Sequence, residues 1–181
     1  LIGSMLATGP AIAGTERKSV GISKPVAEKL LAAYELLQSD EYDRSLAIVD
    51  DLAGRRRLSA PEVAQIHRFR GYIYVNKGMS ERAAEEFEKS LAQQALDASA
   101  EQVMIYSLAQ IYTQLGKYDR ALALIDTWFQ AEQDPKADAW YLKAMILVQQ
   151  EKFALAVEPA ERAIGMSPEP RESWLALLVV I

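Results

Sequence analysis

Residues 140–163 read WYLKAMILVQQEKFALAVEPAERA, and the spacing of the small residues in this stretch decides the fold. Ala144 is followed twelve residues later by Ala156, and apolar residues stand three or four positions from each. Such spacing places the apolar residues on one face of a helix. Two antiparallel helices can approach closely where both present a small side chain. The stretch therefore predicts a pair of packed helices.

The same pattern recurs along the chain at a nearly constant interval. The positions that correspond to Ala144 are Ala33, Gly71 and Ala109, so successive copies lie 38, 38 and 35 residues apart. A second small residue again follows twelve positions later in each copy, as Ser45, Ala83 and Ala121. A period of this length indicates an array of repeats, in which we expect Gly71 and Ala83 to let two helix backbones touch.

Turn and capping signals separate the expected helices. Gly78 and Gly116 stand where a left-handed residue ends a helix. Ser59 and Glu62 fit the capping box at a helix start, and the stretch 99–102 (SAEQ) fits it as well. Residues 134–135 place an aspartate acceptor before a proline, which predicts that a further helix starts there.

These phrases resemble the tetratricopeptide repeat, whose pattern is Trp, Leu-Gly, Tyr, Ala with Phe four residues later, and Pro. The residues that match this pattern best are Trp140, Ala144, Leu147, Ala156, Ala163 and Pro168. The resemblance covers residues 26–181 and implies an all-α fold, a right-handed α-solenoid of antiparallel helix pairs. The repeats are expected at 26–63, 64–101, 102–136 and 137–170, with a partial fifth at 171–181.

The beginning of the chain differs in composition from the repeats. Residues 1–14 read LIGSMLATGPAIAG, carry no charge and end in small residues of the kind that a signal peptidase cleaves after. We interpret them as the remnant of a signal peptide, followed by a linker at 15–25, which predicts a periplasmic or secreted protein. The alternative is that these residues form a frayed apolar arm or an extra capping turn, and that the protein is cytoplasmic.

Composition argues against several kinds of site. The chain has no Cys, one His and a net charge of −5, which excludes disulfides and structural zinc sites and disfavours nucleic acid as a partner. We interpret His67 as a polar substitute at a helix contact, and expect the carboxylates at 50–51 and 85–88 to lie on solvated outer faces. The triple arginine at 55–57 is expected in a solvated loop. Neither a catalytic group, a metal site nor a cofactor is predicted.

In a stack of repeats the first helices line the concave side and leave one stripe free for binding. Residues spaced four and then three or four apart belong to this stripe, and in the first repeat they are Leu30, Tyr34, Leu37 and Gln38. The stripe carries a tyrosine in every repeat. Asn and Gln side chains stand beside these tyrosines, and their amides can pair with a peptide backbone. The predicted partner-binding residues are Tyr34, Arg68, Tyr72, Asn76, Tyr106, Gln110, Gln114, Tyr141 and Met145. The alternative is that these tyrosines merely pack between adjacent repeats.

The best-known peptide site of the family is a two-carboxylate clamp of Lys, Asn and Arg, and this sequence lacks it, since Leu30 and Tyr34 occupy the corresponding positions. A second resemblance rests on the tyrosine-rich first helices and on residues 172–178 (ESWLALL). It is to periplasmic repeat proteins that accompany TonB-type energy transduction. It implies envelope transport components as partners.

The function expected from these features is that of a non-catalytic scaffold that binds a protein or peptide. One alternative is a structural solenoid that self-associates. Another is the repeat part of a larger cytosolic regulator or enzyme. The apolar residues 175–181 form a first helix whose surface is expected to pair with a missing helix or with a second copy of the chain.

The export hypothesis predicts the fate of a reporter. Fused behind an intact leader that includes residues 1–13, the reporter is expected to cross the membrane, as measured by the activity of a reporter that functions only outside the cytosol. A reporter that stays in the cytosol would remove the periplasmic assignment.

Overall fold

The computed structural model describes residues 21–181, and this part of the chain contains nine helices and no strand. The helices are α1 (Lys24–Gln38), α2 (Tyr42–Ala53), α3 (Ala60–Asn76), α4 (Ser80–Ala92), α5 (Ala98–Gln114), α6 (Tyr118–Ala131), α7 (Ala137–Gln149), α8 (Phe153–Gly165) and α9 (Glu172–Val180). The all-α fold predicted from the repeats, a right-handed α-solenoid, is confirmed.

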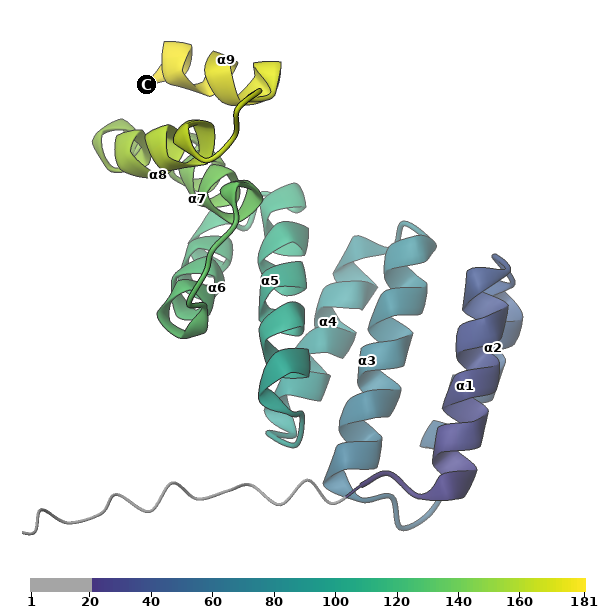
Figure 1. Cartoon of the computed structure of the whole chain (residues 1–181). Helices are drawn as coiled ribbons and strands as arrows, with labels where there is room; N and C mark the ends of the chain where they lie inside the picture. The colour runs from purple at the N-terminus through teal and green to yellow at the C-terminus, as the bar shows by residue number, and fades with distance from the viewer. Residues whose placement is uncertain (1–20) are drawn as a thin grey trace, which may run out of the picture.

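Consecutive helices form antiparallel pairs, and the pairs stack side by side (Figure 1). The pairs are α1 with α2, α3 with α4, α5 with α6 and α7 with α8, and α9 then packs against α8 and α7. In Figure 1 the first helices α1, α3 and α5 stand next to one another, with α2 and α4 behind them. The stack turns toward the C-terminus, so that α8 and α9 run crosswise to α1 in this view.

Small residues make each pair interface, as the sequence predicts. Ala33, Ala109 and Ala144 on the first helices are all fully buried. Their partners on the second helices are Ser45, Ala121 and Ala156, which are fully buried too, as is Ala83, the counterpart of Gly71. In the first pair the Ser45 hydroxyl donates a 2.7 Å hydrogen bond to the carbonyl of Ala33. A serine can therefore replace the alanine because its polar group is satisfied by the paired helix.

The reason for glycine at position 71 differs from the expected one. A Cβ atom on Gly71 would lie 2.3 Å from Cδ1 and Cε1 of the Phe87 ring, which is fully buried. The close approach that requires glycine is thus between the α3 backbone and an aromatic side chain of α4. Ala83 is buried in the same pair, but it is not the group that a larger residue would strike.

The turn and capping predictions are confirmed in part. Gly78 and Gly116 both have φ of +69°, and Ser59 forms the capping box of α3 with Glu62. The other two predicted starts are wrong. Helix α5 begins after Asp97, whose side chain accepts a 2.8 Å bond from the Ala100 N–H. Helix α7 begins only at Ala137, because the chain is still extended at residue 136 and has not entered the helix at 134–135.

Three of the first helices begin slightly before the predicted repeat boundaries, whereas α7 begins at its boundary, residue 137. Helix α1 starts at Lys24, inside the segment expected to be a linker, and α3 and α5 each start four residues before 64 and 102. Counting from the small residues misses these first turns, since capping residues outside the repeated phrase extend the helices. The predicted signal remnant at 1–14 lies outside the described residues.

One carboxylate joins the beginnings of two helices. Glu62 Oε1 accepts bonds from the hydroxyl and the N–H of Ser23, at 2.5 and 3.1 Å, and Oε2 accepts from the N–H and hydroxyl of Ser59, at 2.8 and 2.9 Å. Ser23 and Ser59 are the N-cap residues of α1 and α3. These bonds, led by that from the Ser23 hydroxyl, lower the pKa of Glu62 from 4.5 to about 2. The first two pairs are therefore tied together by a charged cap.

The packing of Gly71 against Phe87 leads to a first stability prediction. Gly71→Ala should lower the free energy of unfolding by about 1–3 kcal/mol, because the new methyl group must displace the buried ring. Gly165→Ala is the matched control, since a Cβ there meets no atom within 4 Å and φ is not positive. Urea denaturation followed by circular dichroism measures both. Equal effects of the two substitutions would contradict the proposed contact.

The Glu62 cap predicts a pH-dependent contribution to stability. Because its pKa is lowered in the folded chain, the stabilisation is present above about pH 4.5 and is lost as the pH falls through about 2. Glu62→Gln should lower the free energy of unfolding at pH 7 by about 1–2 kcal/mol and reduce the loss between pH 4.5 and 2. The exposed Glu85→Gln is the control, and denaturation curves across this pH range give the measurement. An unaltered pH profile in Glu62→Gln would exclude this role.

Candidate functional site

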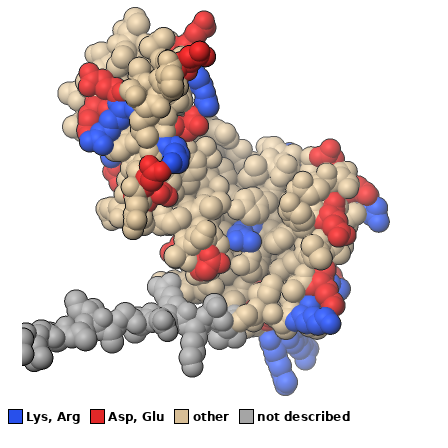
Figure 2. All heavy atoms as spheres, viewed as in Figure 1, with Lys and Arg blue, Asp and Glu red and all other residues tan. Residues whose placement is uncertain are grey.

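The exposed sides of α3 and α5, two first helices that stand next to one another in Figure 1, are called here the first-helix face. Uncharged atoms cover most of this surface where α3 and α5 face the viewer, apart from small basic and acidic areas (Figure 2). Charged side chains gather more densely toward the edges of the molecule in the same view. The face therefore offers apolar and amide groups rather than a strong charge of either sign.

Two cavities open on this face, one on each side of α5. The smaller, about 150 Å³, lies between α3 and α5 and is lined by Tyr72, Val75, Phe87, Ser107, Gln110, Ile111 and Gln114. The larger, about 430 Å³, lies between the first half of α5 and the end of α6. Its walls are Ala98, Ser99, Gln102, Val103, Tyr106, Ser107, Trp128 and Glu132. Ser107 borders both cavities, so the two are neighbours across a single turn of α5.

Four of the nine predicted partner-binding residues line these cavities. Tyr72, Gln110 and Gln114 belong to the smaller cavity and Tyr106 to the larger. Both glutamine side chains are exposed, whereas both tyrosines are half-buried. The stripe predicted from the sequence therefore includes residues that line both cavities.

The other predicted residues lie on the same first helices but have different surroundings. Tyr34 on α1 is 47% exposed, and Arg68 on α3 is half-buried. Asn76 donates a 2.9 Å hydrogen bond to the carbonyl of Tyr72, one turn earlier. Tyr141 stacks on Trp174 of α9, and Met145 packs against the buried core. The prediction that Leu30 and Leu37 belong to the exposed stripe is wrong, since both are buried where α2 and α3 cover that side of α1.

The tyrosines also contribute to packing, which was the alternative interpretation of their pattern. The Tyr72 ring meets Phe87 edge-on at 5.2 Å, and the Tyr106 ring lies 5.1 Å from that of Trp128. Aromatic pairs at these distances stabilise the contact beyond the burial of area alone. Replacing these tyrosines would therefore change stability as well as any binding.

Burial and a nearby carboxylate act on Tyr106. Burial raises the pKa of its hydroxyl, and the negative charge of Asp138 on α7 raises it further. Asp138 itself pairs with Arg171 at 2.8 Å. The negative charge of Asp138 therefore acts on the Tyr106 side chain, which forms part of the wall of the larger cavity.

Several lining residues were missed from the sequence. Val103 and Gln102 lie about one turn before Tyr106, so the same stripe extended by one turn would have found them. Trp128 and Glu132 come from the end of a second helix, and their approach to α5 depends on how the pair is packed. No spacing within a single helix signals that approach.

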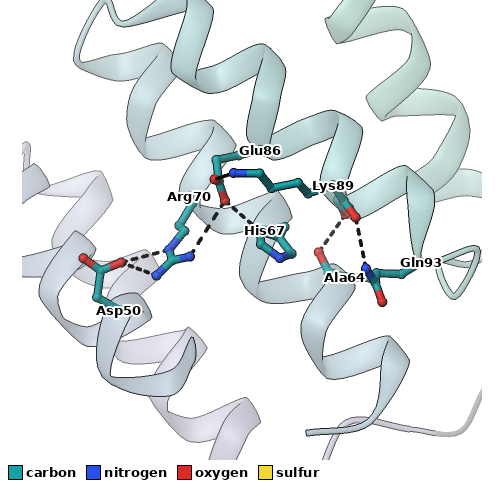
Figure 3. A network of polar contacts seen from close by, with 8 residues as sticks. Asp50, Ala64, His67, Arg70, Glu86, Lys89 and Gln93 are labelled. Atoms are coloured by element: carbon teal, nitrogen blue, oxygen red, sulfur yellow. Dashed lines mark hydrogen bonds and ion pairs between the residues drawn. The ribbon is translucent and has the colours of Figure 1, made fainter. Parts of the chain in front are cut away.

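A network of charges lies away from the first-helix face, between α2, α3 and α4 (Figure 3). His67 Nδ1 lies 2.7 Å from Glu86 Oε2, Lys89 binds Oε1 at 2.7 Å, and Arg70 joins Asp50 at 2.6 Å. Burial raises the pKa of Glu86, but the hydrogen bonds and charges of His67 and Lys89 together outweigh it and lower the pKa. The expectation that Glu86 lies on a solvated outer face is wrong, since it is 7% exposed. Both carboxylate oxygens of Glu86 are bonded to these partners, which indicates a structural role.

Within residues 21–181 no three His, Asp or Glu side chains come together in a way that could hold a metal ion. None of the described helices is both long enough and apolar enough to cross a bilayer.

A chain of stacked, antiparallel helix pairs of this size is a helical repeat protein, and the family comparisons agree. A model described as tetratricopeptide repeat matches residues 30–100, and one described as anaphase-promoting complex, cyclosome, subunit 3 matches residues 76–164. Residues 30–100 are thus similar to the tetratricopeptide repeat, in agreement with the resemblance found in the sequence. No curated protein sequence matches it.

Solved structures with the same fold include MamA residues 41–end from Desulfovibrio magneticus RS-1, at 17% identity and a TM-score of 0.66, covering 82% of this chain and 78% of that one. MamA of strain AMB-1 aligns at 19% identity and a TM-score of 0.63, covering 80% and 74%. The hetero-tetramer Cut9–Hcn1 of the anaphase-promoting complex aligns at 15% identity and a TM-score of 0.65, covering 85% of this chain and 29% of that one. At these identities the likeness establishes the fold alone.

Proposed function

We propose that this chain is a non-catalytic scaffold that binds an extended segment of a partner protein along the first-helix face. One observation carries the proposal: two cavities open side by side across α5 and share Ser107. Tetratricopeptide repeat proteins typically serve as protein-interaction scaffolds, which supports a protein rather than a small molecule as the ligand.

The chemistry of the two cavities suits a peptide. Gln110 and Gln114 present exposed amides, each of which can donate to a carbonyl and accept from an N–H of an extended chain. Tyr106 and Trp128 supply flat apolar surface at low cost in side-chain entropy. Side chains of the segment would enter the cavities while its backbone pairs with the amides.

The proposal extends to the cell envelope. Its support is the apolar, charge-free composition of residues 1–14 and the resemblance of the first helices to repeat proteins of TonB-type transport. Envelope transport components are then the expected partners.

A second candidate is self-association through α9. Leu175, Val179 and Val180 are 46%, 88% and 59% exposed, and the only charged residue of this helix is Glu172 at its start. An apolar helix face of this kind favours contact with another protein surface. In this candidate the solenoid is structural and the first-helix face plays no part.

A bulky substitution at the residue that borders both cavities tests the first proposal. Ser107→Arg should weaken binding of peptides selected from a random library on the unaltered protein by at least about tenfold, as measured by fluorescence anisotropy. The Ser107 hydroxyl binds only the Val103 carbonyl of its own helix, at 2.8 Å, so the fold should be retained.

Thr127→Arg is the matched control for this experiment. Thr127 makes the same kind of bond to Ala123, at 2.8 Å, but it is exposed on α6 away from both cavities. It should leave the affinity within about twofold. Peptides that bind Ser107→Arg as tightly as the unaltered protein would overturn the first-helix face as the binding surface.

A further inference from the structure

The larger cavity has a composition that points to a particular ligand group. Two aromatic rings, Tyr106 and Trp128, form part of its wall with their centroids 5.1 Å apart and their planes at 46°. The carboxylate of Glu132 forms another part, and no Lys or Arg lines the cavity. Aromatic faces and a carboxylate both attract a cation.

An unsatisfied acceptor gives independent support. The Oε1 atom of Gln102, which lines the same cavity, is buried and accepts no hydrogen bond within the described chain. Buried polar atoms are nearly always paired, so an exception calls for an explanation. A ligand that brings N–H donors would supply the missing bond after a small rotation of the side-chain amide.

The charges around the cavity also favour a cationic ligand. Glu132 forms no ion pair among residues 21–181, and one of its oxygens accepts only the N–H of Asp134, at 3.1 Å. The neighbouring bases are occupied, since Lys136 pairs with Asp134 and Arg171 with Asp138. Together with the net charge of −5, this leaves an unneutralised acidic group beside two ring faces.

We propose that this cavity is a receptor for an arginine side chain of the partner segment. The flat guanidinium would lie against the face of Tyr106 or Trp128 and donate to Glu132 and to Oε1 of Gln102. Arginine suits the site better than lysine because its planar group stacks on rings and presents several donors at once. The proposal rests on the proposed function, because it names the side chain that the first-helix face selects.

The site can be tested with fragments that carry only the side chain in question. The probes are N-acetyl-arginine methylamide, its neutral citrulline analogue and its apolar norleucine analogue. Nuclear magnetic resonance titration follows the indole N–H of Trp128, assigned by comparison with Trp128→Phe. The arginine probe should give a saturable shift, and both analogues should bind about tenfold more weakly or not at all.

Two variants locate the cation site. Glu132→Gln should weaken binding of the arginine probe about tenfold, and Gln102→Leu should weaken it severalfold. The control Glu161→Gln removes an exposed carboxylate of α8 and should leave the affinity unchanged. Equal binding of the three probes, no effect of Glu132→Gln, or no shift at 20-fold excess over a roughly millimolar Kd would overturn the proposal.

Library-selected peptides separate this proposal from the broader one. In one outcome the peptides bind and lose affinity with Ser107→Arg, but they show no preference for arginine and their affinity is unchanged by Glu132→Gln. The arginine receptor is then wrong, and the first-helix face remains the binding surface. If the arginine probe binds as expected but no peptide is retained, the receptor stands and the peptide-binding function fails.

Discussion

The close approach of the two helices within each repeat is the constraint on which the rest of the structure depends. It requires a small residue on the first helix, and at Gly71 it requires the absence of a side chain, because the ring of Phe87 occupies the space. Once the helices meet in this way, their large apolar residues are directed into the gaps between neighbouring pairs. The stacking of pairs, and hence the first-helix face, follows from that packing.

The charged residues are distributed so that this face stays largely uncharged. Glu62 is used to cap two helices, and Glu86, Arg70 and Lys89 satisfy one another between α2, α3 and α4. Such buried or half-buried charges are stable only with partners. Glu132, at the end of α6, differs from them because it has no basic partner in the described chain, and it borders the larger cavity. That difference is what gives the cavity its chemical character.

Two tyrosines of the first helices both pack against other aromatic rings and line a cavity. Tyr72 and Tyr106 each place one side against a ring of a second helix while they line a cavity. A ring held in this way has little freedom left to lose when a ligand binds, which favours binding. The two interpretations of the tyrosine pattern, packing and recognition, are therefore compatible for these residues. Tyr141, stacked on Trp174, follows the packing interpretation more closely.

The repeat spacing was sufficient to predict the helix pairs, their small-residue contacts and the glycine-ended turns, because these depend on residues close together in the sequence. It also placed Tyr72, Tyr106, Gln110 and Gln114 on one face. The helix starts at Ala98 and Ala137 were missed, since the sequence contains competing capping signals a few residues away. The burial of Glu86, the approach of Trp128 and Glu132 to α5, and the Phe87 ring above Gly71 all join different helices. Such contacts depend on the angle and register at which helices pack, and no spacing within one helix specifies them.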